Sequence, residues 1–443
     1  MSSELALLSL MEGYMNTKRL ILSLVIMMIS AWTIPSWAIP SFARQTGLPC
    51  QACHTVYPEL TAFGRNFKLN GYTLTDLKQV EASGGNGNLR INEIPALSAM
   101  LTVGFTHTEK DQPAQQNNDT EFPQELSFFY AGEITPHIGS FIQVTYEQVS
   151  NHFNWDNTDI RYANHTNLFG GDTIYGLTLN NGPTVQDVWN STPVWGFPFN
   201  TSHTAPTPAA ATLIDGGLSQ DSVGLGGYAL VKDHLYLEVT GYRSAHLGED
   251  VPTPTIGSIN TIEGVAPYWR VAWQQQFGEN YVEIGAYGLY ASLYPTGYTG
   301  LADDYFDIAG DLQYERSFGN NSISFHTTYI HQTLDPHASD LGGPSLVLNT
   351  FKIDGTYHLA SRAAFTVAYT DTTGDSGRGR WDPFSFGDPL QSPDSASYTL
   401  QAAYLPWQNT KFTVSYIGYT RFDGDTANSS DNNTLFLHAW LMW

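Results

Sequence analysis

Basic residues are scarce in this chain, and so is charge in general. Charged residues make up 14% of the sequence, and 19 lysines and arginines stand against 42 aspartates and glutamates, for a formal net charge of −23. Nucleic-acid binding requires a basic surface, so this balance excludes nucleic acid as a partner. Disorder is excluded on other grounds, because aromatic residues reach 13% and disordered chains contain few of them.

Long apolar runs are missing after the N-terminus, so no later segment has the pattern of a membrane-spanning helix. The N-terminus itself has the form of an export signal. Lys18 and Arg19 precede a short apolar stretch and a small-x-small triplet at 36–38. The apolar stretch is too short for a membrane anchor. We therefore expect residues 1–38 to be a cleaved signal peptide, with Met15 as the true start.

Aromatic residues and 40 glycines are abundant, a mixture typical of an all-β chain that meets lipid. From about Pro95 onward, apolar and polar residues alternate with the period of a strand. In the last segment, one face carries Leu435, Leu437, Ala439, Leu441 and Trp443. The pattern predicts an all-β barrel over residues 95–443 with roughly sixteen strands, starting near residues 95, 123, 140, 158, 172, 219, 234, 265, 280, 304, 321, 346, 361, 395, 410 and 432.

A soluble β-sandwich also shows alternation, but two features favour an outer-membrane barrel. The expected connections alternate between short turns, such as 136–137 and 232–233, and long loops, such as 181–217. The inward faces also carry charges that a sandwich core would not bury unpaired, namely Glu125, Glu133, Glu147, Glu283, Asp307, Asp311, Glu315 and Lys352. We therefore expect the chain to lie in the lipid of a bacterial outer membrane, with its short turns and both barrel ends on the periplasmic side.

Cysteine is used only twice, and both cysteines stand in one motif. Cys50 and Cys53 form CQACH together with His54. C-x-x-C-H is the pattern of a c-type haem attachment site, in which two thiols join one haem and the next residue brings an imidazole to the iron. A redox dithiol would require a βαβ context, and a zinc site would require two more ligands nearby. The motif therefore favours one covalent haem c, with His54 as the proximal iron ligand.

The residues around this motif, 39–80, are too few to form a core of their own. We expect them to form a small helical monohaem cytochrome segment, followed by a linker at 81–94. A packing helix is predicted to begin at Pro58 and to stop at Gly71. The haem and the barrel lumen would supply the missing apolar contacts, so the segment is expected to plug the lumen or to lie at its periplasmic side.

Further haem contacts are less constrained by the sequence. Arg65 and Lys68 are candidates to pair with the haem propionates, although a surface role fits them as well. The distal iron ligand stays open. Met100 is the first candidate because its alternation points it into the lumen, and its rivals are His107, His326, His438 and Met442.

The stretch from Pro40 to Tyr72 resembles the N-terminus of the fused monohaem cytochrome–porin family, the outer-membrane iron oxidases of iron-oxidising bacteria. The matching residues are Phe42-Ala43-Arg44-Gln45-Thr46-Gly47, Cys50, Cys53, His54, Pro58-Glu59-Leu60, Phe63-Gly64-Arg65, Phe67-Lys68 and Gly71-Tyr72. A second match covers the loop at 183–199, whereas the barrel is similar mainly in architecture. The resemblance implies an Fe(II):cytochrome c oxidoreductase-like conduit, in which extracellular Fe(II) gives an electron through one haem to a periplasmic cytochrome.

Other interpretations stay open beside this one. The protein could be a solute porin whose haem is a structural or sensory plug, or the same conduit could serve another donor, such as Mn(II) or an electrode. A conventional enzyme is not expected, because the sequence shows no Ser-His-Asp order, no phosphate-binding glycine loop and no HExxH helix. The acidic chain favours the approach of a cation.

Overall fold

The computed structural model describes residues 41–74, 79–81, 90–93, 95–111, 117–148, 151–245, 261–294, 300–337, 344–376 and 392–443. The predicted signal peptide lies outside the described residues. Within the described part, no helix is both long enough and apolar enough to cross a membrane.

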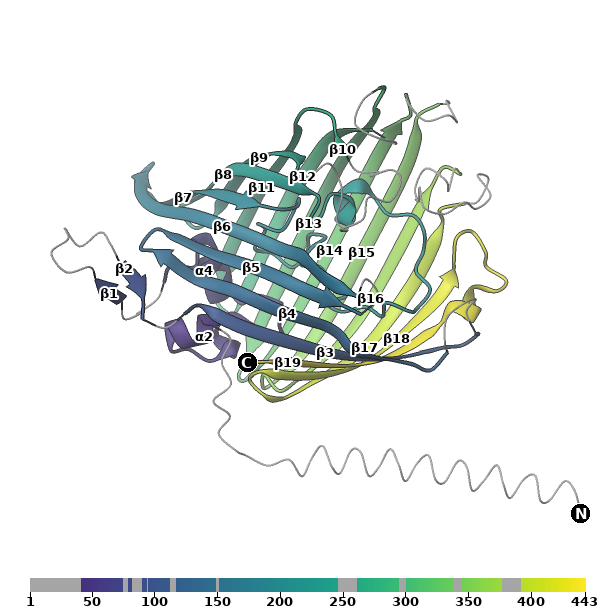
Figure 1. The fold of residues 1–443 in the computed structure, drawn as a ribbon, viewed down its shortest axis with the longest axis horizontal. Coiled ribbons are helices and arrows are strands. Elements are labelled where there is room, and N and C mark those ends of the chain that lie inside the picture. The colour runs from purple at the N-terminus through teal and green to yellow at the C-terminus, as the bar shows by residue number, and fades with distance from the viewer. Residues whose placement is uncertain are drawn as a thin grey trace, which may run out of the picture. The chain divides into compact units, whose positions relative to one another are not determined.

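Sixteen long antiparallel strands close into a barrel (Figure 1). Strand β19 pairs with β3, and β9 pairs with β11, so the ring has no open edge. The strands are β3 (Leu97–Thr108), β4 (Asp119–Thr135), β5 (Ile138–Glu147), β6 (His152–Leu168), β7 (Gly171–Asn180), β8 (Ser222–Val231), β9 (Leu235–Ser244), β11 (Ala266–Phe277), β12 (Asn280–Tyr294), β13 (Asp303–Phe318), β14 (Asn321–Asp335), β15 (Leu346–Leu359), β16 (Ala363–Gly374), β17 (Ser395–Trp407), β18 (Thr410–Arg421) and β19 (Thr434–Met442). A two-residue strand, β10 (Thr261–Ile262), extends the pairing of β12. The predicted strand count is confirmed.

Alternation decides which side chains meet lipid. On β8 and β9, Leu225 and Val239 are each 65% exposed, whereas the neighbouring Thr240 is 1% exposed and faces the interior. In a closed ring, the backbone N–H and C=O groups of each strand form hydrogen bonds with the neighbouring strands. The apolar outer wall can therefore face lipid. A barrel with this apolar wall and a polar interior is an outer-membrane barrel, as the sequence predicted.

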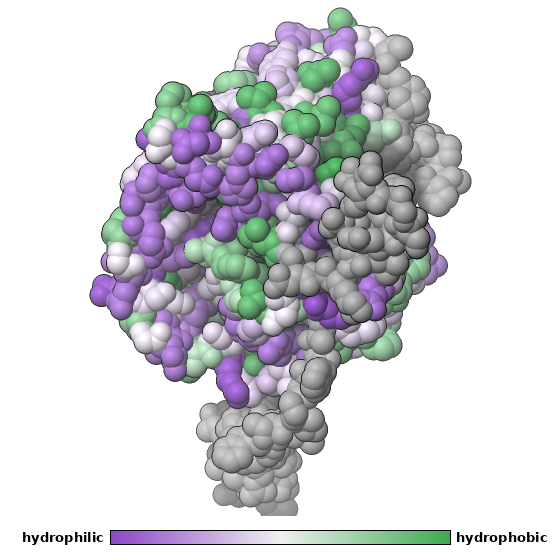
Figure 2. All heavy atoms as spheres, turned by 90° about the vertical axis from the view of Figure 1, so that its left-hand side faces the viewer, coloured by the Kyte–Doolittle hydropathy of each residue, from purple (hydrophilic) through white to green (hydrophobic). Residues whose placement is uncertain are grey.

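The two ends of the barrel differ in their connections. Short turns join β4 to β5, β8 to β9, β11 to β12, β13 to β14, β15 to β16 and β17 to β18, where the sequence predicted them. The start of β3 and the end of β19 lie at this same end, on the left of Figure 1. Figure 2 looks at that end and shows a largely hydrophilic surface around a smaller hydrophobic group. Short turns identify it as the periplasmic end.

The N-terminal segment lies at the short-turn end. It consists of α2 (Ser41–Thr46), α3 (Cys50–Cys53) and α4 (Ala62–Leu69). Its contacts reach lumen-facing residues near the short turns: Ser41 Oγ donates to Ala131 O, and Tyr228 Oη donates to Leu69 O. These contacts join residues 41–74, called the plug below, to β4 and β8 near the short turns.

The predicted start of the packing helix was wrong. Helix α4 begins at Ala62, after Thr61, whose side chain accepts a hydrogen bond from Gly64 N and so caps the helix. Pro58 and Glu59 lie outside it, because the Thr55 amide bonds back to Glu59 O and closes a turn. The predicted stop at Gly71 is confirmed: this glycine has φ of +66° and follows the last turn of α4.

Two short strands span the predicted boundary at residue 80 between the cytochrome segment and the linker. Strands β1 (Gln79–Glu81) and β2 (Arg90–Asn92) pair in antiparallel register. Asn92 Nδ2 also donates to Glu133 O on β4, at 2.6 Å. The connection is thus attached to the barrel and is more than a spacer.

The loop between β7 and β8, residues 181–221, folds into the lumen. Val185, Val188 and Trp189 are each at most 1% exposed. A π-helical turn, η1 (Leu213–Gly217), lies within the same loop, and a 3₁₀ turn, η2 (Ser429–Asn432), precedes β19. The loop also contacts the plug, which the sequence did not predict: Lys68 Nζ donates to Val185 O and Leu60 N donates to Asn190 Oδ1.

Candidate haem centre

The CQACH motif forms one turn of helix and ends in an extended histidine. Cys50 to Cys53 make up α3, and His54 N bonds back to Cys50 O at 2.9 Å. Both thiols are free, and Cys50 is 8% exposed. The cysteines therefore stand one helical turn apart, which is the spacing that attachment of one haem requires.

Helix α4 holds this turn in place. Thr61 Oγ1 donates to Ala52 O at 2.6 Å. A Cβ atom at Gly64 would lie 2.3 Å from Cys53 O, so only glycine allows the two helices to approach this closely.

One ring nitrogen of His54 is held by the backbone. Its Nδ1 lies 3.2 Å from Pro58 O, a carbonyl that can only accept, so Nδ1 carries the proton. The lone pair of the neutral ring then lies on Nε2. A histidine whose Nδ1–H is held by a backbone carbonyl is the usual arrangement of an imidazole that ligates a metal through Nε2.

The motif opens on a cavity of about 510 Å³ inside the barrel. The plug contributes both cysteines, His54, Tyr57, Phe67 and Lys68. The inward loop contributes Trp195 and Phe199, and the barrel wall contributes Met100, Glu125, Glu147, Asp156, His438, Trp440 and Met442. A space of this size is in the range of cofactor sites.

Several polar atoms on this cavity have no hydrogen-bond partner. They are Tyr57 Oη, Trp440 Nε1, Gln124 Oε1 and His438 Nδ1. Buried polar groups are normally paired, so these four atoms are open to a ligand with polar groups. The residues present fit a haem: thiols for attachment, an oriented imidazole, aromatic walls and unpaired donors.

Both thiols of the motif have a raised pKa. Burial raises the pKa of Cys50, and burial together with Cys50 raises the pKa of Cys53 to about 11. Redox-active and metal-binding cysteines have a lowered pKa. No group of three or more His, Cys, Asp or Glu within the described residues is arranged to hold a metal ion. The raised pKa of both thiols does not favour the redox-dithiol alternative.

Arg65 and Lys68 lie in different surroundings. Arg65 binds Glu315 of β13 through two nitrogens, at 2.5 and 3.2 Å, with its guanidinium 4.1 Å from the Tyr281 ring centroid. It does not line the cavity. Lys68 does line it, and its ammonium donates to Val185 O at 2.7 Å. Arg65 thus tethers the plug to the barrel, and of the two residues only Lys68 lines the cavity.

The distal-ligand candidates separate into two groups. Met100, His438 and Met442 line the cavity. His107 lies at the far end of β3, 2.9 Å from Asn118, and His326 belongs to a different cluster described below. The inward direction predicted for Met100 is confirmed, since it is 3% exposed and lines the lumen.

Known structures with similar folds are outer-membrane proteins. A loop-deletion mutant of OmpT of Vibrio cholerae is 14% identical with a TM-score of 0.45, and the match covers 78% of this chain and 98% of that one. OmpF of Salmonella typhi in complex with daunomycin is 13% identical with a TM-score of 0.47 (83% and 100% covered). The outer-membrane channel DcaP of Acinetobacter baumannii is 10% identical with a TM-score of 0.47 (83% and 100%). Protein-family models and curated proteins gave no match to the sequence.

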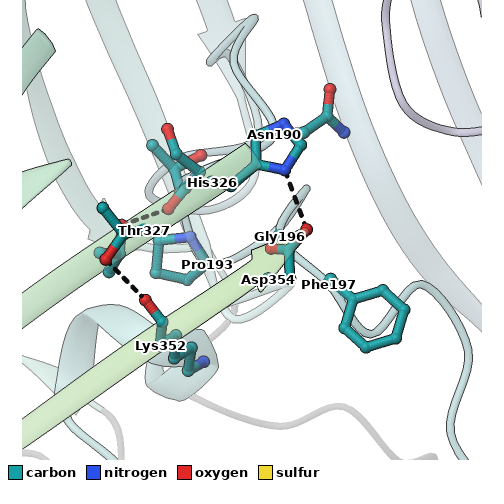
Figure 3. A pocket seen from close by; sticks show the side chains of 11 residues that line it. Asn190, Pro193, Gly196, Phe197, His326, Thr327, Lys352 and Asp354 are labelled. Carbon is teal, nitrogen blue, oxygen red and sulfur yellow. Dashed lines mark hydrogen bonds and ion pairs between the residues drawn. The ribbon is translucent and has the colours of Figure 1, made fainter. Parts of the chain in front are cut away.

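A buried acid–base cluster, which the sequence did not point to, fastens the plug on the side of β14 and β15. Glu59 is 1% exposed, and its carboxylate lies 3.6 Å from His358 Nε2 and 4.0 Å from His326 Nε2. His326 Nδ1 is 3.0 Å from Asp354 (Figure 3). A pocket of about 20 Å³ beside them has room for about one water molecule.

Glu59 makes the stability of the fold depend on pH. Burial alone would raise its pKa, but His358 and His326 lower the pKa of Glu59 to about 2. A depressed carboxyl pKa stabilises the fold above the ordinary value near 4.5, and this contribution is lost as the pH falls toward 2. In Glu59→Gln we expect thermal midpoints to lose this acid dependence and the fold to lose about 3 kcal/mol at neutral pH. Parallel pH curves for the variant and the wild type would contradict this role.

A second buried cluster fastens the inward loop. Arg270 of β11 lies 2.9 Å from Asp187 of the loop, 3.0 Å from Glu283 and 2.7 Å from Asp311, and all four side chains are 0% exposed. Ser191 of the loop also binds Asp311. Four of the charges predicted on the inward faces bind the loop or the plug. Asp307 accepts from Ile214 N and Asp311 from Ser191, while Lys352 pairs with Asp215 and Glu315 pairs with Arg65.

Proposed function

We propose that this protein is an outer-membrane electron conduit that oxidises extracellular Fe(II) and passes the electron to a periplasmic cytochrome. One covalent haem c would be held by Cys50 and Cys53, with His54 as its proximal ligand. The observation that carries the proposal is the CQACH turn opening on a cavity inside a lipid-embedded barrel, with Nδ1 of His54 fixed by Pro58 O.

The residues of the cavity have separable roles. The haem, when bound, supplies a one-electron couple. His54 is held in the tautomer that ligates through Nε2. Tyr57 Oη, Trp440 Nε1 and the ammonium of Lys68 are donors available to the haem carboxylates. The aromatic rings of Phe67, Trp195 and Phe199 exclude water from the site.

The carboxylates favour a cation as the electron donor. Glu125, Glu147 and Asp156 line the same cavity, and the chain as a whole carries a formal charge of −23. Acidic clefts concentrate cations. Each Fe(II) would lose one electron and remain outside as Fe(III), while one acceptor cytochrome gains the electron, so no iron has to be imported.

Proteoliposomes test the proposal directly. Liposomes that hold the haem-loaded protein in the membrane and oxidised cytochrome c inside are mixed with external Fe(II) under anaerobic conditions. We expect the trapped cytochrome c to be reduced, and we expect no reduction in protein-free liposomes or with redox-inert Zn(II). If Fe(II) leaves the trapped cytochrome oxidised at the organism's working pH while another donor reduces it, the iron assignment is wrong.

A solute porin is the second candidate, because the fold is that of a channel. The plug and the loop at 181–221 fill the lumen, and both are anchored by buried ion pairs. We therefore expect planar bilayers to show a much smaller conductance than an unplugged sixteen-stranded barrel. A steady large conductance in the intact protein would instead favour the porin.

A further inference from the structure

The cavity contains one buried base that packing does not explain. His438 is 5% exposed, and its Nδ1 has no hydrogen-bond partner. Its ring neighbours are Phe436 and Trp440, with centroids at 5.5 and 6.1 Å. The nearby ammonium of Lys411 is a donor only, and it is bonded to Tyr57 O at 2.9 Å. Leaving an imidazole nitrogen buried and unpaired is unfavourable.

Strand register places His438 on the same wall as the methionines but at another height. Met442 lies opposite Met100, whereas His438, four residues earlier on β19, lies opposite Gly104. At the rise of a strand the two levels are about 14 Å apart. One iron can therefore take its second axial ligand from only one level.

The methionine level is already explained by packing. Met442 packs against an apolar cluster that includes Val56, Tyr57 and Leu405. A thioether is only a weak acceptor and needs no partner. Trp440 stands between the two levels and meets Tyr57 at 5.7 Å, and Tyr57 in turn meets His54 at 6.5 Å. The motif therefore faces Trp440, between the level of His438 and the level of the two methionines. Packing explains the methionine level, but it does not explain the unpaired nitrogen of His438.

We propose that His438 is the second axial ligand of the haem, opposite His54. This inference rests on the proposed function, because it presumes the haem. It replaces Met100 as the first candidate. Methionine ligation raises the reduction potential of a c-type haem, so two histidines would give the conduit a lower potential than a His–Met pair would.

Axial-ligand spectroscopy of the full-length, haem-loaded protein tests this. We expect low-spin oxidised haem without the near-infrared charge-transfer band of methionine ligation. His438→Ala should turn the haem high-spin, and added imidazole should restore the low-spin spectrum. His438→Met should gain the methionine band and raise the midpoint potential, an effect that a merely structural role would not produce.

Met100→Leu and Met442→Leu are the matched controls, and both should leave the spectrum unchanged. The inference is overturned if either methionine variant becomes high-spin while His438→Ala stays low-spin. If His438→Ala contains haem with unaltered ligation, this inference is wrong and the proposed function is unaffected. A protein without covalent haem sinks both.

Discussion

Replacing both Cys50 and Cys53 with alanine should abolish covalent haem attachment and all reduction of the trapped cytochrome by Fe(II). Both thiols line the cavity and neither is in a disulfide, so they have no other covalent role. Only a thioether holds a haem through denaturation. The measurement is haem-stained denaturing electrophoresis, together with the proteoliposome assay. Each single variant should keep at most one thioether and a weaker stain.

The double variant should still form a barrel. Its strands are paired around the whole ring without using the motif, and the plug keeps its Arg65–Glu315 tether. Heat-modifiable migration in gels reports the folded barrel and serves as the control. If Fe(II) reduces the trapped cytochrome as fast through this variant as through the wild type, the motif does not carry the electrons.

The largest loss of stability is expected for Arg270→Met. This side chain compensates Asp187, Glu283 and Asp311 in a region without solvent. Removing the cation leaves three buried carboxylates facing one another, and breaking a buried ion pair costs about 3–5 kcal/mol. We expect the folding midpoint in urea to fall accordingly. The loop at 181–221 should also become accessible to protease, since Asp187 anchors it.

Arg316→Met is the matched control for this change. Arg316 lies on β13 and is exposed. Surface substitutions of this kind usually change the free energy of unfolding by less than about 0.5 kcal/mol. Equal midpoints for the two methionine variants would show that the Arg270 cluster does not hold the loop.

The barrel could be predicted from the sequence because its rules are local. Alternation with period two fixes which residues face lipid, and turn residues such as Lys232 and Asp233, both at positive φ, mark the short connections. The same alternation placed Met100 and Glu283 correctly inside. The haem assignment stays a prediction, which rests on three residues at the fixed spacing that haem attachment requires.

Contacts between distant segments could not be predicted. The position of Arg65 next to the motif suggested a haem contact. In the structure its guanidinium binds Glu315, which lies 250 positions later in the sequence. The inward fold of the loop depends on Asp187 meeting Arg270, which no local pattern encodes. Glu59 was visible in the sequence, but its two histidine partners lie on β14 and β15. A buried charge is recognisable only once its partner is known.

The account depends most on the covalent haem in the barrel cavity. The most direct measurement is the haem content of the purified protein after secretion by cells that mature c-type cytochromes, determined as pyridine haemochrome per chain after extraction with acidic acetone. The account predicts one haem per polypeptide that the solvent does not remove. A colourless barrel, or a haem that passes entirely into the solvent, would contradict it.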